Sequence, residues 1–128
     1  MSRILVVEDD VLIAMDLEAL LESVGCTVLG PVSSESAALE LIEDSSPDLA
    51  LLDINLNGGN AFGIADKLAG KKIPFAFLTG HSENFVPPAH SARPVFNKPY
   101  HHKNLVRDLL RLIPQASSGK DGLSVARR

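Results

Sequence analysis

The sequence predicts a three-layer α/β sandwich built around a mostly parallel sheet. Short apolar runs alternate with stretches whose apolar residues recur at helical spacing, the pattern of strands joined by crossover helices. Several of the runs are continuously apolar, as expected for strands covered on both faces. The 128 residues fit a single domain, since a typical domain has about 100–150 residues.

Five short apolar runs are the candidate strands. They are Ile4–Val7, Thr27–Leu29, Leu49–Leu52, Phe75–Leu78 and Val95–Phe96. Each is too short to cross a domain as a helix, and each is followed by polar or turn-forming residues. A parallel sheet with right-handed crossovers accommodates them in chain order.

Helical spacing appears in four stretches. The first carries the apolar stripe Ile13, Leu17, Leu20, Leu21 and Val24. Asp10 is its expected N-cap and Gly25 its expected end. The other three centre on residues 38–42, 62–69 and 105–113, the last of them opened by Pro99 and closed by Pro114. Pro87 and Pro88 forbid a regular helix through the fourth crossover, so a short helix or a loop is expected there.

Composition and charge exclude several classes of protein. The net charge is −4 with neutral histidines, and no basic block is present, so a nucleic-acid-binding face is not expected. No apolar run reaches the about 18 residues of a membrane span, and the chain shows no signal peptide, so a cytoplasmic protein is expected. Cys26, the one cysteine, is expected to be a structural thiol. The folded domain is expected to be 1–114, with a disordered polar tail at 115–128.

Polar side chains terminate the predicted strands. Glu8 and Asp9, followed by Asp10, end the first strand, and Asp53 ends the third, with Asn55 two residues on. Thr79 ends the fourth strand and Lys98 the fifth. Because the carboxyl ends of parallel strands lie at one edge of the sheet, we expect these groups to meet there.

Three carboxylates at one edge need a counter-charge. Two carboxylates ~5 Å apart repel by roughly 3 kcal/mol at an effective dielectric of 20. Mg²⁺ with oxygen ligands, supplemented by a phosphate, is the usual solution. Lys98 is a point charge suited to a phosphoryl group. The implied chemistry is phosphoryl transfer to or from a carboxylate.

The runs ILVVEDD, LLDINL, FLTG and NKPY, in this order, resemble the receiver domain of two-component response regulators. The resemblance implies a flavodoxin-like five-stranded parallel sheet of order 2-1-3-4-5. It implies that Asp53 is the phosphoacceptor and that Mg²⁺ is bound by Glu8, Asp9, Asp53 and the backbone carbonyl of Asn55. It also implies that the Thr79 hydroxyl contacts the phosphoryl group, that Lys98 pairs with it, and that the Lys98–Pro99 bond is cis.

The FLTG run further resembles the Phe-Ala-Thr-Gly (FAT GUY) subgroup of single-domain receivers from alphaproteobacteria, with Leu78 in place of Ala and His81 in place of an aromatic residue. Many receivers carry an aromatic switch residue three positions before the lysine. Here that position is Val95, and Phe96 beside it should point to the opposite face of the strand.

The function expected from the resemblance is a stand-alone response regulator that receives a phosphoryl group from a sensor histidine kinase and signals through a phosphorylation-induced surface change. Alternatives are a phosphate sink or phosphorelay intermediate, with a downstream or phosphotransfer protein as partner, and a phosphorylation-independent binding module. The chain is expected to be a monomer or weak dimer and to catalyse only its own phosphorylation and dephosphorylation. A phosphohydrolase usually needs a second Asp where Asn55 stands. The four histidines lack the spacing of a zinc site.

Overall fold

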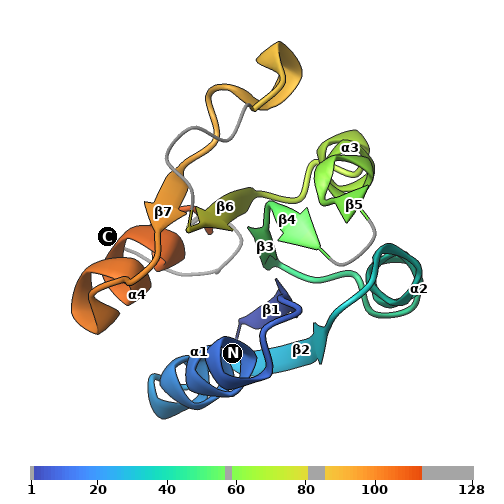
Figure 1. Ribbon diagram of the computed structural model, residues 1–128. Helices are drawn as coiled ribbons and strands as arrows, with labels where there is room; N and C mark the ends of the chain where they lie inside the picture. Colours follow the sequence, from blue (N-terminus) through green and yellow to red (C-terminus); the bar gives the residue numbers. More distant parts are fainter. Residues whose placement is uncertain (1, 57–58, 81–85, 114–128) are drawn as a thin grey trace, which may run out of the picture.

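A computed structural model describes residues 2–56, 59–80 and 86–113. Five parallel strands form the central sheet in the order β2-β1-β3-β6-β7 (Figure 1). They are β1 (Arg3–Val7), β2 (Thr27–Val32), β3 (Leu49–Asp53), β6 (Phe75–Thr79) and β7 (Val95–Asn97). The predicted order 2-1-3-4-5 is confirmed, since β6 and β7 are the fourth and fifth strands of this sheet.

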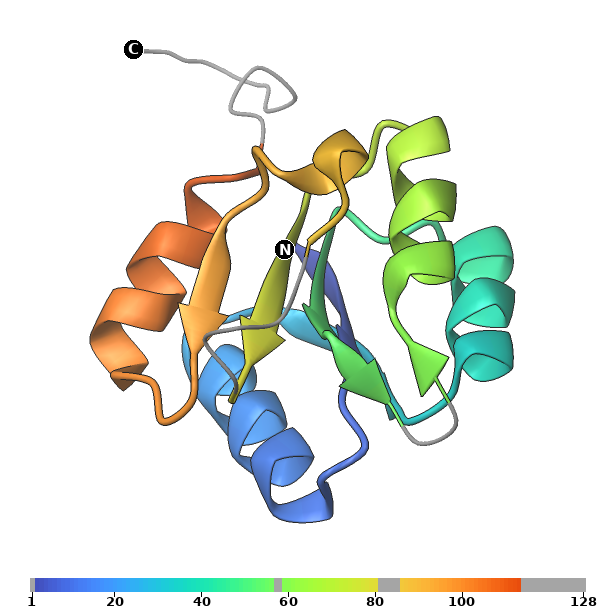
Figure 2. The same cartoon turned by 45° about the horizontal axis from the view of Figure 1, so that its top comes forward.

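Four helices cover the two faces of the sheet, which completes the predicted three layers (Figure 2). They are α1 (Val11–Ser23), α2 (Glu35–Ser45), α3 (Phe62–Gly70) and α4 (His102–Leu110). One apolar core joins the sheet to α1 and α4, through residues such as Leu17 and Leu109. A second core joins the other face to α2 and α3, through residues such as Ile42 and Leu68. None of the helices among the described residues is long and apolar enough to cross a membrane.

The helix boundaries follow from the local sequence. Asp10 caps α1 as predicted, because its carboxylate accepts hydrogen bonds from the backbone N–H groups of Leu12 and Ile13. Gly25 follows the end of α1 with φ +90°, a left-handed conformation that suits glycine. His101 is the N-cap of α4 and is exposed together with His102, as expected for the start of that helix.

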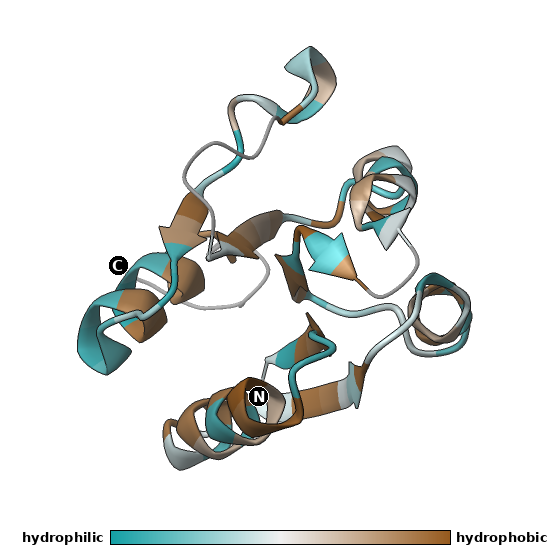
Figure 3. Cartoon of the chain, in the orientation of Figure 1, coloured by the Kyte–Doolittle hydropathy of each residue, from teal (hydrophilic) through white to brown (hydrophobic). Residues whose placement is uncertain are grey.

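The hydropathy of the chain matches these layers (Figure 3). The strands of the sheet are mainly hydrophobic, and α4 divides into a hydrophobic and a hydrophilic side. Helix α1 is an exception to the usual pattern, since it also exposes apolar side chains at its beginning: Val11, Leu12 and Met15. Cys26 is buried, which raises the pKa of its thiol and agrees with the predicted structural role.

Three features differ from or refine the predictions. Strand β2 continues beyond the predicted Thr27–Leu29 to Val32. A small antiparallel hairpin, β4 (Asn55–Leu56) with β5 (Gly59–Asn60), was not predicted and lies between β3 and α3. In the described part of the fourth crossover, the only helix is one 3₁₀ turn, η1 (Pro88–His90), which confirms the expected short helix. The segment 81–85 of that crossover and the predicted tail, 115–128, lie outside the described residues.

Strand β7 places its two hydrophobic side chains differently. Val95 is 43% exposed, whereas Phe96 is partly buried and packs against the core formed with α1 and α4. This alternation agrees with the expectation that the two side chains point to opposite faces. The position three residues before Lys98 therefore presents a small aliphatic side chain to the surface.

Candidate functional site

The carboxylates of the predicted site meet at the carboxyl edge of the sheet. Glu8 follows β1, Asp9 is the next residue, and Asp53 is the last residue of β3. Each offers one oxygen, and these oxygens all lie within 4.8 Å of one another. Glu8 is 3% and Asp53 4% exposed, so two of the three acids are withdrawn from water. The edge therefore concentrates negative charge in a poorly solvated place.

Lys98 supplies the positive charge at this cluster. It follows β7, and its Nζ lies 3.0 Å from Glu8 Oε1 and 3.3 Å from Asp53 Oδ2. Its backbone N–H donates to the carbonyl of Thr79 at 2.8 Å, which places the ends of β6 and β7 side by side. Thr79 is 3% exposed. The structure thus brings together, at one sheet edge, the residues that the strand ends predicted.

The turn after β1 fixes the orientation of the Glu8 side chain. The backbone N–H of Asp10 donates to Glu8 Oε2 at 3.0 Å, and the backbone N–H of Glu8 donates to the carbonyl of Val32 at 2.9 Å. The backbone N–H of Asn55 similarly donates to Asp53 Oδ1 at 3.3 Å. These local bonds orient two carboxylates before any ligand arrives. The role of the Asn55 carbonyl in metal binding stays a prediction.

Burial and neighbouring charge shift the protonation of the site. Burial, together with the hydrogen bond and the charge of Glu8, raises the pKa of Asp53 to about 7, although Lys98 opposes the shift. Burial pulls the pKa of the Lys98 ammonium down, but its hydrogen bond to Glu8 and the charges of Asp53 and Glu8 outweigh burial and raise it. Lys98 is therefore charged at neutral pH and does not fully compensate the acids.

The donor set fits a hard divalent cation. Glu8 Oε1 is buried and has no hydrogen-bond partner among the described residues, although the Lys98 ammonium lies beside it. One ammonium does not balance three carboxylates, two of them buried, and a divalent cation would supply the missing positive charge. Glu8, Asp9 and Asp53 offer oxygen ligands of the kind that Mg²⁺ prefers.

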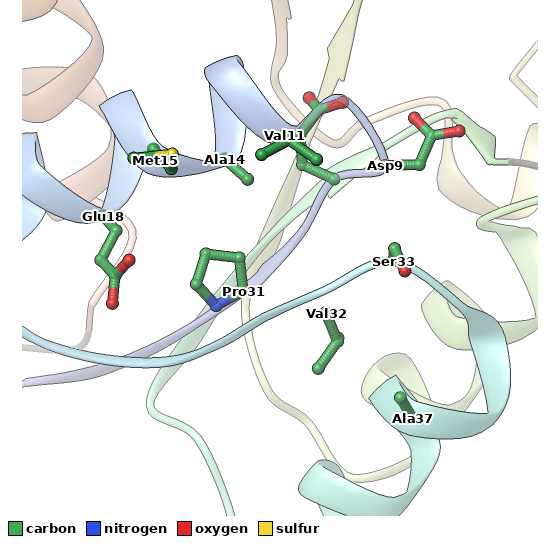
Figure 4. A pocket seen from close by; sticks show the side chains of 10 residues that line it. Asp9, Val11, Ala14, Met15, Glu18, Pro31, Val32, Ser33 and Ala37 are labelled. Atoms are coloured by element: carbon green, nitrogen blue, oxygen red, sulfur yellow. The ribbon is translucent and has the colours of Figure 1, made fainter.

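A cavity leads from the carboxylates to the surface (Figure 4). It measures about 540 Å³ and lies between α1 and the wall formed by the end of β2 and the start of α2. Glu8 and Asp9 belong to its lining, Met15 and Glu18 to its α1 wall, and Pro31 to its opposite wall. Asp9, the partly exposed member of the cluster, is therefore accessible to solvent from this side.

Two groups of side-chain contacts, one beside the site and one at the opposite edge of the sheet, were not predicted from the sequence. The Tyr100 hydroxyl donates to Asp16 Oδ2 at 2.6 Å, and His102 Nε2 lies 3.0 Å from the same oxygen. His90, 3% exposed, lies with its Nε2 2.7 Å from Asp66 Oδ1 and packs edge-on against Phe75. The sequence signal for the first was weak: Tyr100 and His102 follow the NKP run, and Asp16 faces them from another helix.

Comparisons with known proteins agree with this arrangement. A family model described as the response regulator receiver domain matches residues 4–109. The regulator PhyR of Methylorubrum extorquens is 38% identical over 88 residues, which are 66% of this chain and 33% of PhyR. PdtaR of Mycobacterium tuberculosis is 34% identical over 82 residues, 63% of this chain and 40% of PdtaR. The chain thus spans well under half the length of these two relatives.

This chain is also similar to a solved structure over most of its length. The solution structure of SdrG from Sphingomonas melonis Fr1 is 41% identical with a TM-score of 0.77, covering 88% of this chain and 95% of SdrG. PhyR and SdrG as neighbours are consistent with the FAT GUY resemblance seen in the sequence. Because the family model matches most of the chain and the fold and acidic edge agree with it, the chain belongs to the response regulator receiver domain family.

Proposed function

We propose that this receiver domain accepts a phosphoryl group from a sensor histidine kinase on Asp53, in a reaction that depends on Mg²⁺. The observation that carries the proposal is the cluster at the carboxyl edge of the sheet, where the Lys98 ammonium lies 3.3 Å from Asp53 Oδ2 and oxygens of Glu8, Asp9 and Asp53 lie within 4.8 Å of one another. An acceptor, a cation for the phosphoryl group and a set of metal ligands are therefore within reach of one another.

In the transfer step, an oxygen of Asp53 attacks phosphorus and the phosphorus–nitrogen bond of the phosphohistidine breaks. The product is an acyl phosphate, and the electron pair of the broken bond stays on the imidazole nitrogen, which gains a proton. We propose that Lys98 pairs with the phosphoryl oxygens and that Thr79, at the end of the adjacent strand, donates a hydrogen bond to them, which the joined ends of β6 and β7 support. When bound, Mg²⁺ neutralises charge on the phosphoryl oxygens and the acids.

Asp53 must be ionised to act as the nucleophile. The pKa of about 7 means that burial and Glu8 keep a proton on this cluster in much of the metal-free protein at neutral pH. A cation held by Glu8, Asp9 and Asp53 would displace that proton, because metal ligands of this kind bind as carboxylates. Binding of a metal by these acids would therefore also favour the ionised form of Asp53, which is the form that attacks the phosphoryl group.

The proposed role is signalling, with catalysis limited to the domain's own phosphorylation and dephosphorylation. Asn55 stands two residues after Asp53, where an amide cannot serve as the acid or base of a hydrolase. A phosphoryl group that draws Thr79 and Lys98 toward Asp53 would change the surface beside β6 and β7. A downstream protein, or a phosphotransfer protein in a relay, would read that change.

The test is incubation with acetyl phosphate and Mg²⁺ followed by intact mass measurement. The native protein is expected to gain the mass of one phosphoryl group, and the Asp53→Asn variant is expected to gain none. Asp44→Asn is a matched control, because Asp44 is exposed on α2 and the same change leaves the site intact. The kinase reaction is then followed with labelled phosphohistidine donor.

Equal uptake by native protein and Asp53→Asn would refute the assignment of the acceptor. Continuous release of phosphate without an adduct would favour a hydrolase. No reaction with either donor, in protein that binds Mg²⁺, would favour the phosphorylation-independent binding module.

A further inference from the structure

The segment that carries Lys98 has little support from the sheet. Strand β7 has three residues and pairs only with β6 among the described strands. Its last support is the hydrogen bond from the Lys98 N–H to the Thr79 carbonyl, after which the chain leaves the sheet at Pro99. Phe96 and Tyr100, on either side of Lys98, pack against the core formed with α1 and α4, but the packing at Lys98 itself is incomplete. A hollow of about 480 Å³ adjoins Lys98 and Pro99 and is bounded on the α1 side by Leu12 and Ile13.

A second anchor lies on the other side of this hollow. Tyr100, two residues after Lys98, donates its hydroxyl to Asp16 Oδ2 at 2.6 Å. The partly buried Tyr100 hydroxyl keeps its proton at neutral pH, because burial and the hydrogen bond to Asp16 raise its pKa. Asp16 belongs to α1, the helix that begins directly after Glu8 and Asp9. The bond therefore ties the Lys98 segment to the element that follows the acids.

We infer that Asp16 and Tyr100 are positioning residues of the phosphoryl site, which hold Lys98 so that its ammonium stays between Glu8 and Asp53. The inference rests on the proposed function and adds two residues to it that touch neither the acids nor a phosphoryl group. Their action is local: the Asp16–Tyr100 bond holds the chain two residues after Lys98 against α1, while the bond from the Lys98 N–H to the Thr79 carbonyl holds it to β6.

His102 also contacts Asp16, but this contact is weaker than the Tyr100–Asp16 hydrogen bond. Its Nε2 lies 3.0 Å from Asp16 Oδ2, but its side chain is 55% exposed and that of Asp16 is 44% exposed, so water weakens the pair. The Tyr100 bond is shorter and more buried, and an O–H donor to a carboxylate at this distance makes a strong hydrogen bond. Tyr100 is therefore expected to matter more than His102.

The experiment measures the affinity for beryllofluoride in the presence of Mg²⁺, and the affinity for Mg²⁺ alone. Tyr100→Phe is expected to weaken beryllofluoride binding about tenfold, the effect of losing one hydrogen bond to a charged group. Its Mg²⁺ affinity should stay unchanged, because Glu8, Asp9 and Asp53 hold the metal without Lys98.

Asp16→Ala should match Tyr100→Phe, Asp16→Asn should recover most of the loss through its amide oxygen, and His102→Gln should change little. Glu22→Ala, exposed on the same helix, is the control that should behave as native protein.

A double-mutant cycle separates positioning from a general loss of stability. In a Lys98→Ala background, Tyr100→Phe should weaken binding no further, because its effect passes through Lys98. In the metal-free protein, hydrogen exchange at the Lys98 amide should be faster in Tyr100→Phe than in native protein.

Three results would overturn the inference while leaving the proposed function intact. They are native affinity in Tyr100→Phe, an equal loss in the Lys98→Ala background, and a parallel loss of Mg²⁺ affinity. Native protein that takes up neither beryllofluoride nor a phosphoryl group would instead overturn the proposed function, and this inference with it.

Discussion

The acids and the cation of this site come from strands in different surroundings. Strand β1 lies between β2 and β3, and β3 lies between β1 and β6, and the side chains that precede Glu8 and Asp53 in these strands are almost entirely buried. Strand β7 is at the edge of the sheet, is shorter, and exposes Val95. The nucleophile and metal ligands are thus held by the core, whereas Lys98 depends on contacts made after its strand ends.

This difference has a functional consequence. Groups that are fixed by a packed core keep their geometry without a ligand, as a metal site and an acceptor require. An ammonium on a less supported segment can move when the phosphoryl group arrives. The central strands and the edge strand should therefore respond differently to substitution.

The largest expected effect concerns Glu8, Asp9 and Asp53, the acids at the ends of the central strands. Removal of Mg²⁺ with excess chelator should stop phosphoryl uptake completely, because Glu8, Asp9 and Asp53 would then repel the arriving phosphoryl group with only Lys98 to offset them. The measurement is the rate of adduct formation by mass at several Mg²⁺ concentrations. Uptake at the native rate in chelator would contradict the proposed role of the acids.

Lys98, which follows the edge strand β7, should contribute less to the rate of phosphoryl uptake. Lys98→Ala is expected to slow phosphoryl uptake about ten- to a hundredfold, the loss of one charge-assisted hydrogen bond, while Mg²⁺ affinity is maintained or increased. Lys98→Arg keeps the charge with a different shape and is the matched control. Single-turnover transfer rates distinguish them. A Lys98→Ala variant that loses Mg²⁺ binding would show that the metal-binding acids and Lys98 do not act separately.

The central strand β1 and the edge strand β7 can also be compared by making a valine-to-alanine substitution in each. Val6→Ala in β1, where Val6 is fully buried, should lower the free energy of unfolding by about 2 kcal/mol through lost burial and a cavity. Val95→Ala in β7 should change it by less than about 0.5 kcal/mol, because Val95 is already largely hydrated. Urea denaturation measures both. Equal losses would mean that β7 is part of the packed core.

A further expected effect is a pH dependence of stability in the metal-free protein. The pKa of Asp53 is about 7 in the folded state and about 3.9 when unfolded, so the folded state binds the extra proton between these values. Stability should therefore fall as pH rises from 4 to 7. Asp53→Asn removes this loss and should be more stable than native protein at pH 8 by about 1 kcal/mol or more, but not at pH 4.

The control for this prediction is Asp44→Asn, whose exposed carboxylate should leave the native pH dependence unchanged. Urea denaturation in chelator at pH 4, 6 and 8 gives the comparison. A stability difference between native protein and Asp53→Asn that is the same at every pH would contradict the raised pKa.

Much of the candidate site could be predicted because it lies at strand ends. Runs such as Leu49–Leu52 mark buried strands by composition alone, and the carboxyl ends of parallel strands share an edge whatever the details of packing. That rule placed Glu8, Asp53 and Lys98 together, and the structure brings them within ion-pair distance. The proline pair Pro87–Pro88 likewise predicted a crossover with no more than a short helix.

Other features needed more than a local signal. Gly58–Gly59 in the run NLNGGN indicates a turn, but not the strand pairing beside it. The β4–β5 hairpin spans two residues on each side, too few to show a period, and depends on pairing between Asn55 and Asn60. His90 reads in the sequence as one more loop histidine, yet it is buried against Phe75 and bonded to Asp66. Only the path of the chain over the sheet puts these side chains together.

By itself, the sequence determined the alternation of strands and helices, the polar strand ends, and hence the meeting of the acids, Thr79 and Lys98 at one edge. These follow from periodicity and from the shared direction of parallel strands, which are properties of each segment. The tertiary structure alone decided that Asp16 and Tyr100, 84 residues apart, share a hydrogen bond and that Glu8 and Asp53 are almost fully buried. Burial and long-range contact depend on how separate elements pack, and no single segment encodes that packing.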